Sequence, residues 1–94
     1  MSWQLLYSKA TRKDAAKLKS SNLQTMVDKL LDLLEKDPLT NSPPYEKLVG
    51  DLDGFYSRRI NIKHRLIYRV DKAHRRVFIE RMWTHYESIE HNAI

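Results

Sequence analysis

The stretch that decides the fold runs Gly54-Phe55-Tyr56-Ser57-Arg58-Arg59-Ile60 and continues, after three residues, with His64-Arg65-Leu66-Ile67-Tyr68. We interpret the two runs as neighbouring strands over 55–61 and 64–70, and we expect a third strand over 75–83. Because the connections between them are short, the three strands are predicted to form an antiparallel meander of hairpins.

Side chains alternate between the two faces of a strand, and this assigns the arginines of the stretch. Arg58 and Arg59 point to opposite faces, so at most one of them is aimed into a site. Arg65 lies on the face opposite to Leu66 and Tyr68, which we assign to the core. Because desolvating an arginine is costly, a sheet with this many cations is predicted to face an anion.

The residues before the sheet predict one strand and two helices. Trp3-Gln4-Leu5-Leu6-Tyr7 is typical of a short strand, and Ser8 is suited to cap a basic helix over 9–19. A second helix follows from an apolar stripe and ends before Pro38. The stripe consists of Leu23, Met26, Val27, Leu30, Leu31 and Leu34. A loop over 37–45 contains all three prolines. We therefore expect an α+β fold, with two N-terminal helices packed on one face of a small antiparallel sheet.

The composition indicates one small domain, 1–94, in which the tail 87–94 is either a mobile extension or a cover over the site. The absence of cysteine excludes a disulfide framework and a thiolate nucleophile. The histidines are not spaced as metal ligands usually are, so neither a metal nor another cofactor is expected. No apolar run approaches a membrane span and no signal-peptide pattern begins the chain, so we expect a cytoplasmic protein.

The net charge of +5 is unevenly distributed along the chain. Residues 1–54 carry eight basic and eight acidic side chains, whereas residues 55–86 carry nine basic and two acidic ones. A basic excess can serve solubility alone. Its concentration on a predicted sheet favours a polyanion, most often a nucleic acid.

The quoted stretch, together with Glu46 and Leu48 upstream and His85-Tyr86 downstream, resembles the YoeB/Txe branch of the RelE/ParE toxin superfamily. The resemblance implies a RelE-like, microbial ribonuclease-type fold. It also implies a toxin of a type II toxin–antitoxin pair that acts as a ribosome-dependent endoribonuclease. Such an enzyme cuts mRNA in the ribosomal A site without a metal and stops translation.

The resemblance also implies a role for particular residues. Glu46 matches the general base that takes the proton of the ribose 2′-hydroxyl, Arg65 the phosphate clamp, and His85 the general acid. Arg59 matches a further phosphate-binding arginine, and Tyr86 an aromatic residue near the substrate. Without the resemblance, a glutamate after two prolines is usually a solvated loop residue, and a strand arginine is as often an ion-pair partner.

The chain departs from the family pattern in two places, at Val49 and in the length of chain after Tyr86, and the role of Arg58 is also open. Val49 occupies the position of a common family lysine, so Lys47 either reaches the phosphate from a shifted angle or that contact is missing. Arg58 is expected either to bind RNA or to pack against the helices. Eight residues follow Tyr86, which is more than in close relatives.

The implied partners are a YefM/Axe-like antitoxin, the 70S ribosome and mRNA, and operator DNA only through the antitoxin complex. Whether two copies form a homodimer is left open, and no membrane partner is expected. Two alternatives remain. One is a ParE-like gyrase inhibitor, and the other is a non-catalytic RNA-binding module that needs Arg59 and Arg65 but neither Glu46 nor His85.

Overall fold

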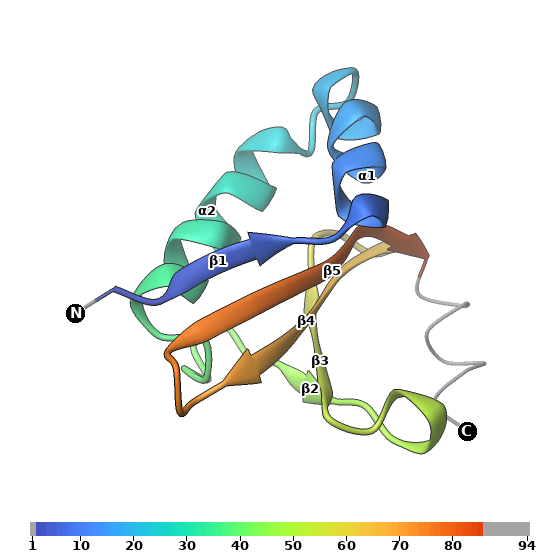
Figure 1. Cartoon of the computed structure of the whole chain (residues 1–94). Helices are drawn as coiled ribbons and strands as arrows, with labels where there is room; N and C mark the ends of the chain where they lie inside the picture. The colour runs from blue at the N-terminus through green and yellow to red at the C-terminus, as the bar shows by residue number, and fades with distance from the viewer. Residues whose placement is uncertain (1, 86–94) are drawn as a thin grey trace.

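The predicted α+β class is confirmed by the computed structural model, in which two α-helices lie against a five-stranded sheet within residues 2–85 (Figure 1). Residues 2–85 are described, and their side chains up to residue 82. The elements are β1 (Gln4–Tyr7), α1 (Lys9–Lys19), α2 (Gln24–Lys36), β2 (Glu46–Lys47), the 3-10 helix η1 (Gly50–Leu52), β3 (Phe55–Arg59), β4 (His64–Asp71) and β5 (Arg76–His85). The strand order is β1-β5-β4-β3-β2.

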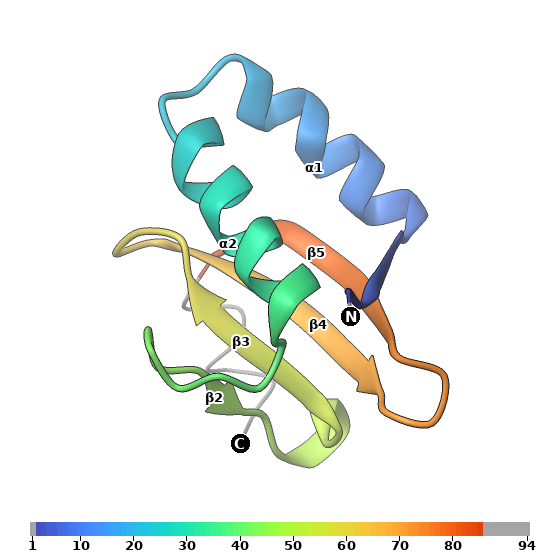
Figure 2. The same ribbon diagram turned by 90° about the vertical axis from the view of Figure 1, so that its left-hand side faces the viewer.

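Both helices cover the same face of the sheet, as the apolar stripe predicted (Figure 2). The bounds of α1 agree with the prediction, and the Ser8 hydroxyl accepts a hydrogen bond from the Thr11 backbone N–H at 3.0 Å. The core between the layers comprises Leu18, Val27, Leu30, Leu34, Ile60, Leu66, Tyr68, Val77, Ile79 and Met82. No helix within residues 2–85 combines the length and the apolar character that a membrane crossing requires.

Helix α1 is fastened to β5 by polar side chains, which the sequence did not reveal. Asp14 is 1% exposed, and its carboxylate accepts hydrogen bonds from Arg81 Nε at 2.8 Å and from the Met82 backbone N–H at 2.9 Å. The hydrogen bond from Arg81 to Asp14 raises the pKa of Arg81 above its ordinary value. Thr11 donates to the Ile79 carbonyl at 2.7 Å. Buried polar contacts therefore supplement the single fully buried leucine of this helix, Leu18.

The expectation of a wholly antiparallel sheet is wrong at one edge. Strands β3, β4 and β5 form the antiparallel meander, but β1 pairs with β5 in parallel, with Leu5 opposite Val77. Short connections dictate antiparallel pairing only where they join consecutive strands. The two helices intervene after β1, so nothing in the local sequence determined its direction.

A small second cluster of apolar side chains covers part of the face of the sheet away from the helices. Leu48 and Ile67 are each 4% exposed there, with Leu52 and Phe55 packed against them. The segment between β2 and β3 supplies Leu48 and Leu52. The rest of this face lies outside that cluster, beside the two-residue strand β2. It carries the charged side chains described next.

Candidate functional site

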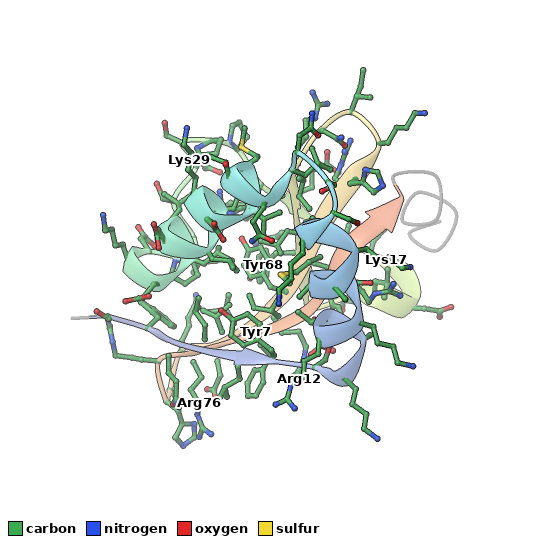
Figure 3. The ribbon with its side chains drawn as sticks, turned by 90° about the horizontal axis from the view of Figure 1, so that it is seen from above. Tyr7, Arg12, Lys17, Lys29, Tyr68 and Arg76 are labelled. Carbon is green, nitrogen blue, oxygen red and sulfur yellow. The ribbon has the colours of Figure 1, made fainter. Side chains whose placement is uncertain are left out.

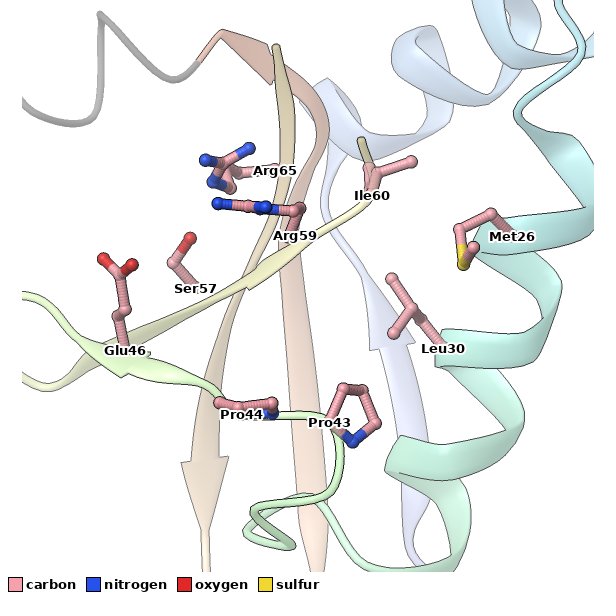
Figure 4. Close-up of a pocket in the computed structure, with 9 residues that line it drawn as sticks. All are labelled: Met26, Leu30, Pro43, Pro44, Glu46, Ser57, Arg59, Ile60 and Arg65. Carbon is pink, nitrogen blue, oxygen red and sulfur yellow. The ribbon is translucent and has the colours of Figure 1, made fainter. Parts of the chain in front are cut away.

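Four polar side chains share one face of the sheet because of the strand register. Arg59 of β3 is paired with Arg65 of β4, and Glu46 of β2 is paired with Ser57 of β3. Directly paired residues project to the same face, and Ser57 and Arg59 are two residues apart on one strand. Figure 4 shows Glu46, Ser57 and both guanidinium groups directed into a common space.

These side chains line a cavity of about 580 Å³, a size typical of small-ligand sites. Its lining residues are Met26, Leu30, Pro43, Pro44, Glu46, Ser57, Arg59, Ile60 and Arg65. One side of the cavity is therefore charged, and the other is an apolar wall from α2 and the proline loop. An anion with an attached planar or apolar group suits such a surface.

Glu46 owes its position to the two-residue strand β2, which the sequence did not predict. The strand is held to β3 by the pairs Glu46–Ser57 and Lys47–Tyr56, and the Leu48 N–H donates to the Phe55 carbonyl at 2.9 Å. Glu46 is exposed, so its carboxylate is accessible to a substrate. A carboxylate across from two guanidinium groups can accept a proton while they neutralise an anion.

Lys47 is not brought into the cavity. It follows Glu46 on the same strand, so it projects to the opposite face, and it is absent from the lining residues. Val49, at the position of the family lysine, is 57% exposed. Of the two alternatives for this contact, the structure favours the one in which it is missing.

Arg65 is 5% exposed, and the turn between β3 and β4 orients it. Its Nη1 donates to the carbonyl of Asn61 at 2.7 Å and to that of His64 at 3.2 Å. Asn61 in turn accepts, through Oδ1, the backbone N–H groups of Lys63 at 2.9 Å and His64 at 2.7 Å. The turn therefore holds the guanidinium against the cavity that Arg65 lines. Arg59, by contrast, is exposed.

The RNA-binding role expected for Arg58 is not supported, because its side chain is 1% exposed and points to the other face. Its guanidinium donates to the carbonyls of Pro38, Thr40 and Pro43, and its Nε donates to the Tyr68 hydroxyl at 2.9 Å. The alternative expectation, that Arg58 packs against the helices, is right that the side chain is buried, but its hydrogen-bond partners are the loop over 37–45 and Tyr68.

We expect the buried Tyr68 beside Arg58 to make the protein sensitive to alkali. Burial raises the pKa of Tyr68 from 10.0 to about 12, although the nearby Arg58 opposes the rise and Tyr45 and Tyr56 add to it. A folded-state pKa above the unfolded value stabilises the fold below pH 10.0, and this contribution is lost as the pH rises to about 12. It amounts to about 3 kcal/mol at most.

The measurement compares urea unfolding of the wild type and Tyr68→Phe from about pH 8 to about pH 11.5, across the ordinary tyrosine range. At the lower pH the variant should be less stable by about 1 kcal/mol, the typical worth of a lost hydrogen bond. The difference should shrink and then reverse as the pH rises, since the other titrating groups are common to both proteins. A difference that stays constant over this range would contradict the prediction.

The two C-terminal candidates lie at the limit of the described residues. The backbone of His85 ends β5 opposite His64, beside the pair formed by Arg65 and Thr84. Its side chain is outside the described part, and so are Tyr86 and the tail 87–94. The roles expected for His85 and Tyr86 therefore stay predictions.

Two residues of the site were missed by sequence reasoning, and each had a usable signal. Ser57 is 3% exposed and shares the face of Arg59, which its spacing on the strand already implied. Asn61 opens a short turn before Arg65, and an asparagine there commonly bonds to the backbone two residues further on.

Among the side chains of residues 2–82, no three His, Cys, Asp or Glu groups lie close enough together to hold a metal ion.

A family described as "YoeB-like toxin of bacterial type II toxin-antitoxin system" matches residues 7–86. Among curated proteins, Toxin YoeB of Mycobacterium bovis is 40% identical over 43 residues, which are 46% of this chain and 51% of that protein. The chain thus spans about half the length of the curated relatives it matches.

Solved structures resemble nearly the whole described fold. The YoeB/ParE toxin of Agrobacterium tumefaciens superposes with a TM-score of 0.79 at 25% identity, covering 88% of this chain and 99% of that one. YoeB of Staphylococcus aureus, solved both in a heterotetrameric complex with YefM and as a dimer, gives a TM-score of 0.75 at 29% identity, covering 89% of this chain and 98% of that one.

Proposed function

Because the chain belongs to the YoeB-like toxins of bacterial type II toxin–antitoxin systems, we propose that it is a ribosome-dependent endoribonuclease that cuts mRNA in the A site and so inhibits translation. The observation that carries the proposal is the convergence of Glu46, Arg59 and Arg65 on one cavity. A carboxylate base and phosphate-binding cations are two of the three kinds of group that cleavage by the ribose 2′-hydroxyl requires, and the third is an acid for the leaving oxygen.

In the proposed reaction, Glu46 takes the proton of the 2′-hydroxyl, and the 2′-oxygen forms a bond to the adjacent phosphorus. The bond between phosphorus and the 5′-oxygen breaks, and His85 donates a proton to that oxygen. The proton taken and the proton given balance, so no further reactant is needed. Tyr86, which follows His85, is proposed to contact the substrate beside the leaving group.

Arg59 and Arg65 are proposed to stabilise the negative charge that builds on the phosphate oxygens. Each preorganised donor of this kind contributes roughly 10²–10³ in rate. Arg65 is already held by the carbonyls of its turn and lines the cavity, so little reorganisation is needed when the phosphate arrives. Arg59 is exposed and supplies the second charge from the neighbouring strand.

Dependence on the ribosome fits a site of so few groups. Orientation of the substrate can supply a large part of a rate enhancement, and the ribosome would provide it by holding the mRNA. The balance of nine basic to two acidic side chains over residues 55–86 suits the backbone of ribosomal RNA, with an affinity that falls as salt rises.

The proposed protein partner is a cognate antitoxin of the YefM/Axe type with a flexible acidic segment that folds onto the toxin. The complex of Staphylococcus aureus YoeB with YefM supports this partner, and the dimer of that YoeB supports a homodimer here as well. Binding to operator DNA is proposed only for the toxin–antitoxin complex. Since the ribosome is the proposed site of action, the cytoplasm is the proposed compartment.

The test is cleavage of a defined mRNA by the purified protein with and without 70S ribosomes, with the cut positions mapped. Cuts in the A-site codon are expected only when ribosomes are present. His85→Ala should slow the reaction roughly 10²-fold or more, the usual contribution of a general acid. His74→Ala is the matched control, because His74 is in the β4–β5 turn with its side chain 63% exposed.

The absence of cleavage under all conditions, with the protein folded, would contradict the proposal. Inhibition of DNA gyrase would then be assayed on the same preparation. Cleavage of free mRNA at the same rate as ribosome-bound mRNA would contradict the dependence on the ribosome alone.

A further inference from the structure

The loop over 37–45 leads directly into the strand that carries Glu46, yet it has little structure of its own. Within it, the Thr40 N–H reaches the Asp37 carbonyl at 3.4 Å and the Leu39 N–H reaches the Asp37 carboxylate at 3.1 Å. Three of its residues are prolines, which lack an N–H to donate. Something outside the loop must therefore hold it in place.

The side chain of Arg58 holds the loop from outside. Its Nη2 donates to the Pro38 carbonyl at 3.0 Å and to the Thr40 carbonyl at 2.7 Å, and its Nη1 donates to the Pro43 carbonyl at 2.7 Å. One guanidinium thus gathers three carbonyls from both ends and the middle of the loop. The Tyr68 hydroxyl closes the arrangement, because it accepts from Arg58 Nε and donates to the Pro38 carbonyl at 2.9 Å.

The same side chain also contacts the residue that immediately precedes Glu46. The Arg58 guanidinium lies over the ring of Tyr45, 5.1 Å from its centroid. Tyr45 in turn meets Tyr56 edge to face at 5.4 Å, and Tyr56 stacks on Tyr68 at 5.5 Å. The backbone is therefore held on the N-terminal side of Glu46 by these ring contacts, and on its other side by the pairing of β2 with β3.

We propose that Arg58 is a positioning residue that holds Glu46 at the reacting phosphate by clamping the loop over 37–45. The inference rests on the function proposed above. Strand β3 would then carry two neighbouring arginines with different tasks: Arg59 faces the phosphate and Arg58 faces the loop. The placement of Glu46 relative to Arg59 would then depend on β3 twice, through its pairing with β2 and through the hold of Arg58 on the loop.

Arginine suits this role better than any other side chain. It presents five N–H donors in a rigid plane, whereas lysine offers three from one point. A buried guanidinium is costly unless hydrogen-bonded, and here the loop carbonyls supply the hydrogen bonds. The loop and the arginine therefore stabilise each other, and neither keeps its position alone.

The test compares the wild type with Arg58→Lys and Tyr68→Phe in single-turnover cleavage of ribosome-bound mRNA. It also follows hydrogen exchange of the amides from Leu39 to Lys47. Arg58→Lys is expected to slow cleavage roughly 10²-fold, the effect of a misplacement of about 1 Å, with the apparent affinity for the ribosome complex unchanged. Tyr68→Phe keeps the ring and loses only the hydrogen bond between Arg58 Nε and the hydroxyl and that from the hydroxyl to Pro38, so a smaller loss of rate is expected. Both variants should lose amide protection in the loop.

Leu18→Ala is the matched control, since Leu18 is fully buried in α1 and is not among the residues that line the cavity. It lowers stability without removing any of the hydrogen bonds that Arg58 donates to the loop and to Tyr68, so its cleavage rate should equal that of the wild type at a temperature where all variants are folded. The proposal is overturned if Arg58→Lys cleaves at the wild-type rate, or if rate and affinity fall together. Failure of the proposed function is seen separately, because the wild type itself would then not cleave.

Discussion

Glu46→Gln is expected to bind ribosome-bound mRNA as the wild type does and to cleave it roughly 10²–10⁴ times more slowly, the range that general-base catalysis covers. The amide has the shape of the carboxylate but cannot take the proton of the 2′-hydroxyl. Glu46 is exposed on β2 and lines the cavity, so the substitution should leave the fold intact. Single-turnover rates and ribosome co-sedimentation measure the two quantities separately.

Asp51→Asn is the matched control, because it makes the same change of carboxylate to amide in the exposed 3-10 helix η1. It should cleave at the wild-type rate. If Glu46→Gln also cleaves at that rate, Glu46 is not the base, and the reaction must use another acceptor.

Arg65→Ala is expected to weaken both binding and cleavage, with the rate falling by roughly 10³ when a preorganised charge is removed. The loss has two physical sources. The phosphate loses a cation, and the carbonyls of Asn61 and His64 lose their Arg65 donor. Arg65→Lys should recover part of the binding but little of the rate, because lysine cannot hold the turn and a phosphate with one planar group. Rates and affinities measured over a range of salt concentrations distinguish the two contributions.

Arg69→Ala serves as the control for a lost charge on the same strand. Arg69 contacts Glu80 at 3.2 Å and lies over Phe78 at 4.6 Å, and it does not line the cavity. Its removal should reduce affinity slightly and leave the rate unchanged. Equal effects of Arg65→Ala and Arg69→Ala would mean that only the overall charge of this face matters.

Much of the fold followed from local patterns. The cap at Ser8 and the basic run after it predicted α1 with the bounds that the structure has. Three- and four-residue spacing predicted the apolar stripe of α2, of which Val27, Leu30 and Leu34 are buried, whereas Met26 is 44% exposed. The arrangement of the two edge strands, β1 and β2, was harder to predict from the sequence. The residues of β1 were predicted as a strand, but its parallel pairing with a strand some seventy residues away had no local signal, and β2 is only two residues long.

The candidate site shows the same division. Alternation along β4 correctly separated Arg65 from Leu66 and Tyr68, and alternation along β3 correctly placed Arg58 and Arg59 on opposite faces. It did not show that Glu46 joins the two arginines, because β2 reaches them only through pairing with β3.

From the residues alone, one could therefore read which way each side chain leaves its own strand or helix. That direction depends on the two- and 3.6-residue periods of the backbone. What each side chain then meets was decided only by the tertiary structure. Arg58 could be read as pointing away from Arg59, but its partners lie at Pro38, Thr40 and Pro43, fifteen to twenty residues earlier in an irregular loop. No periodic pattern records such contacts, because they form only when separate segments pack together.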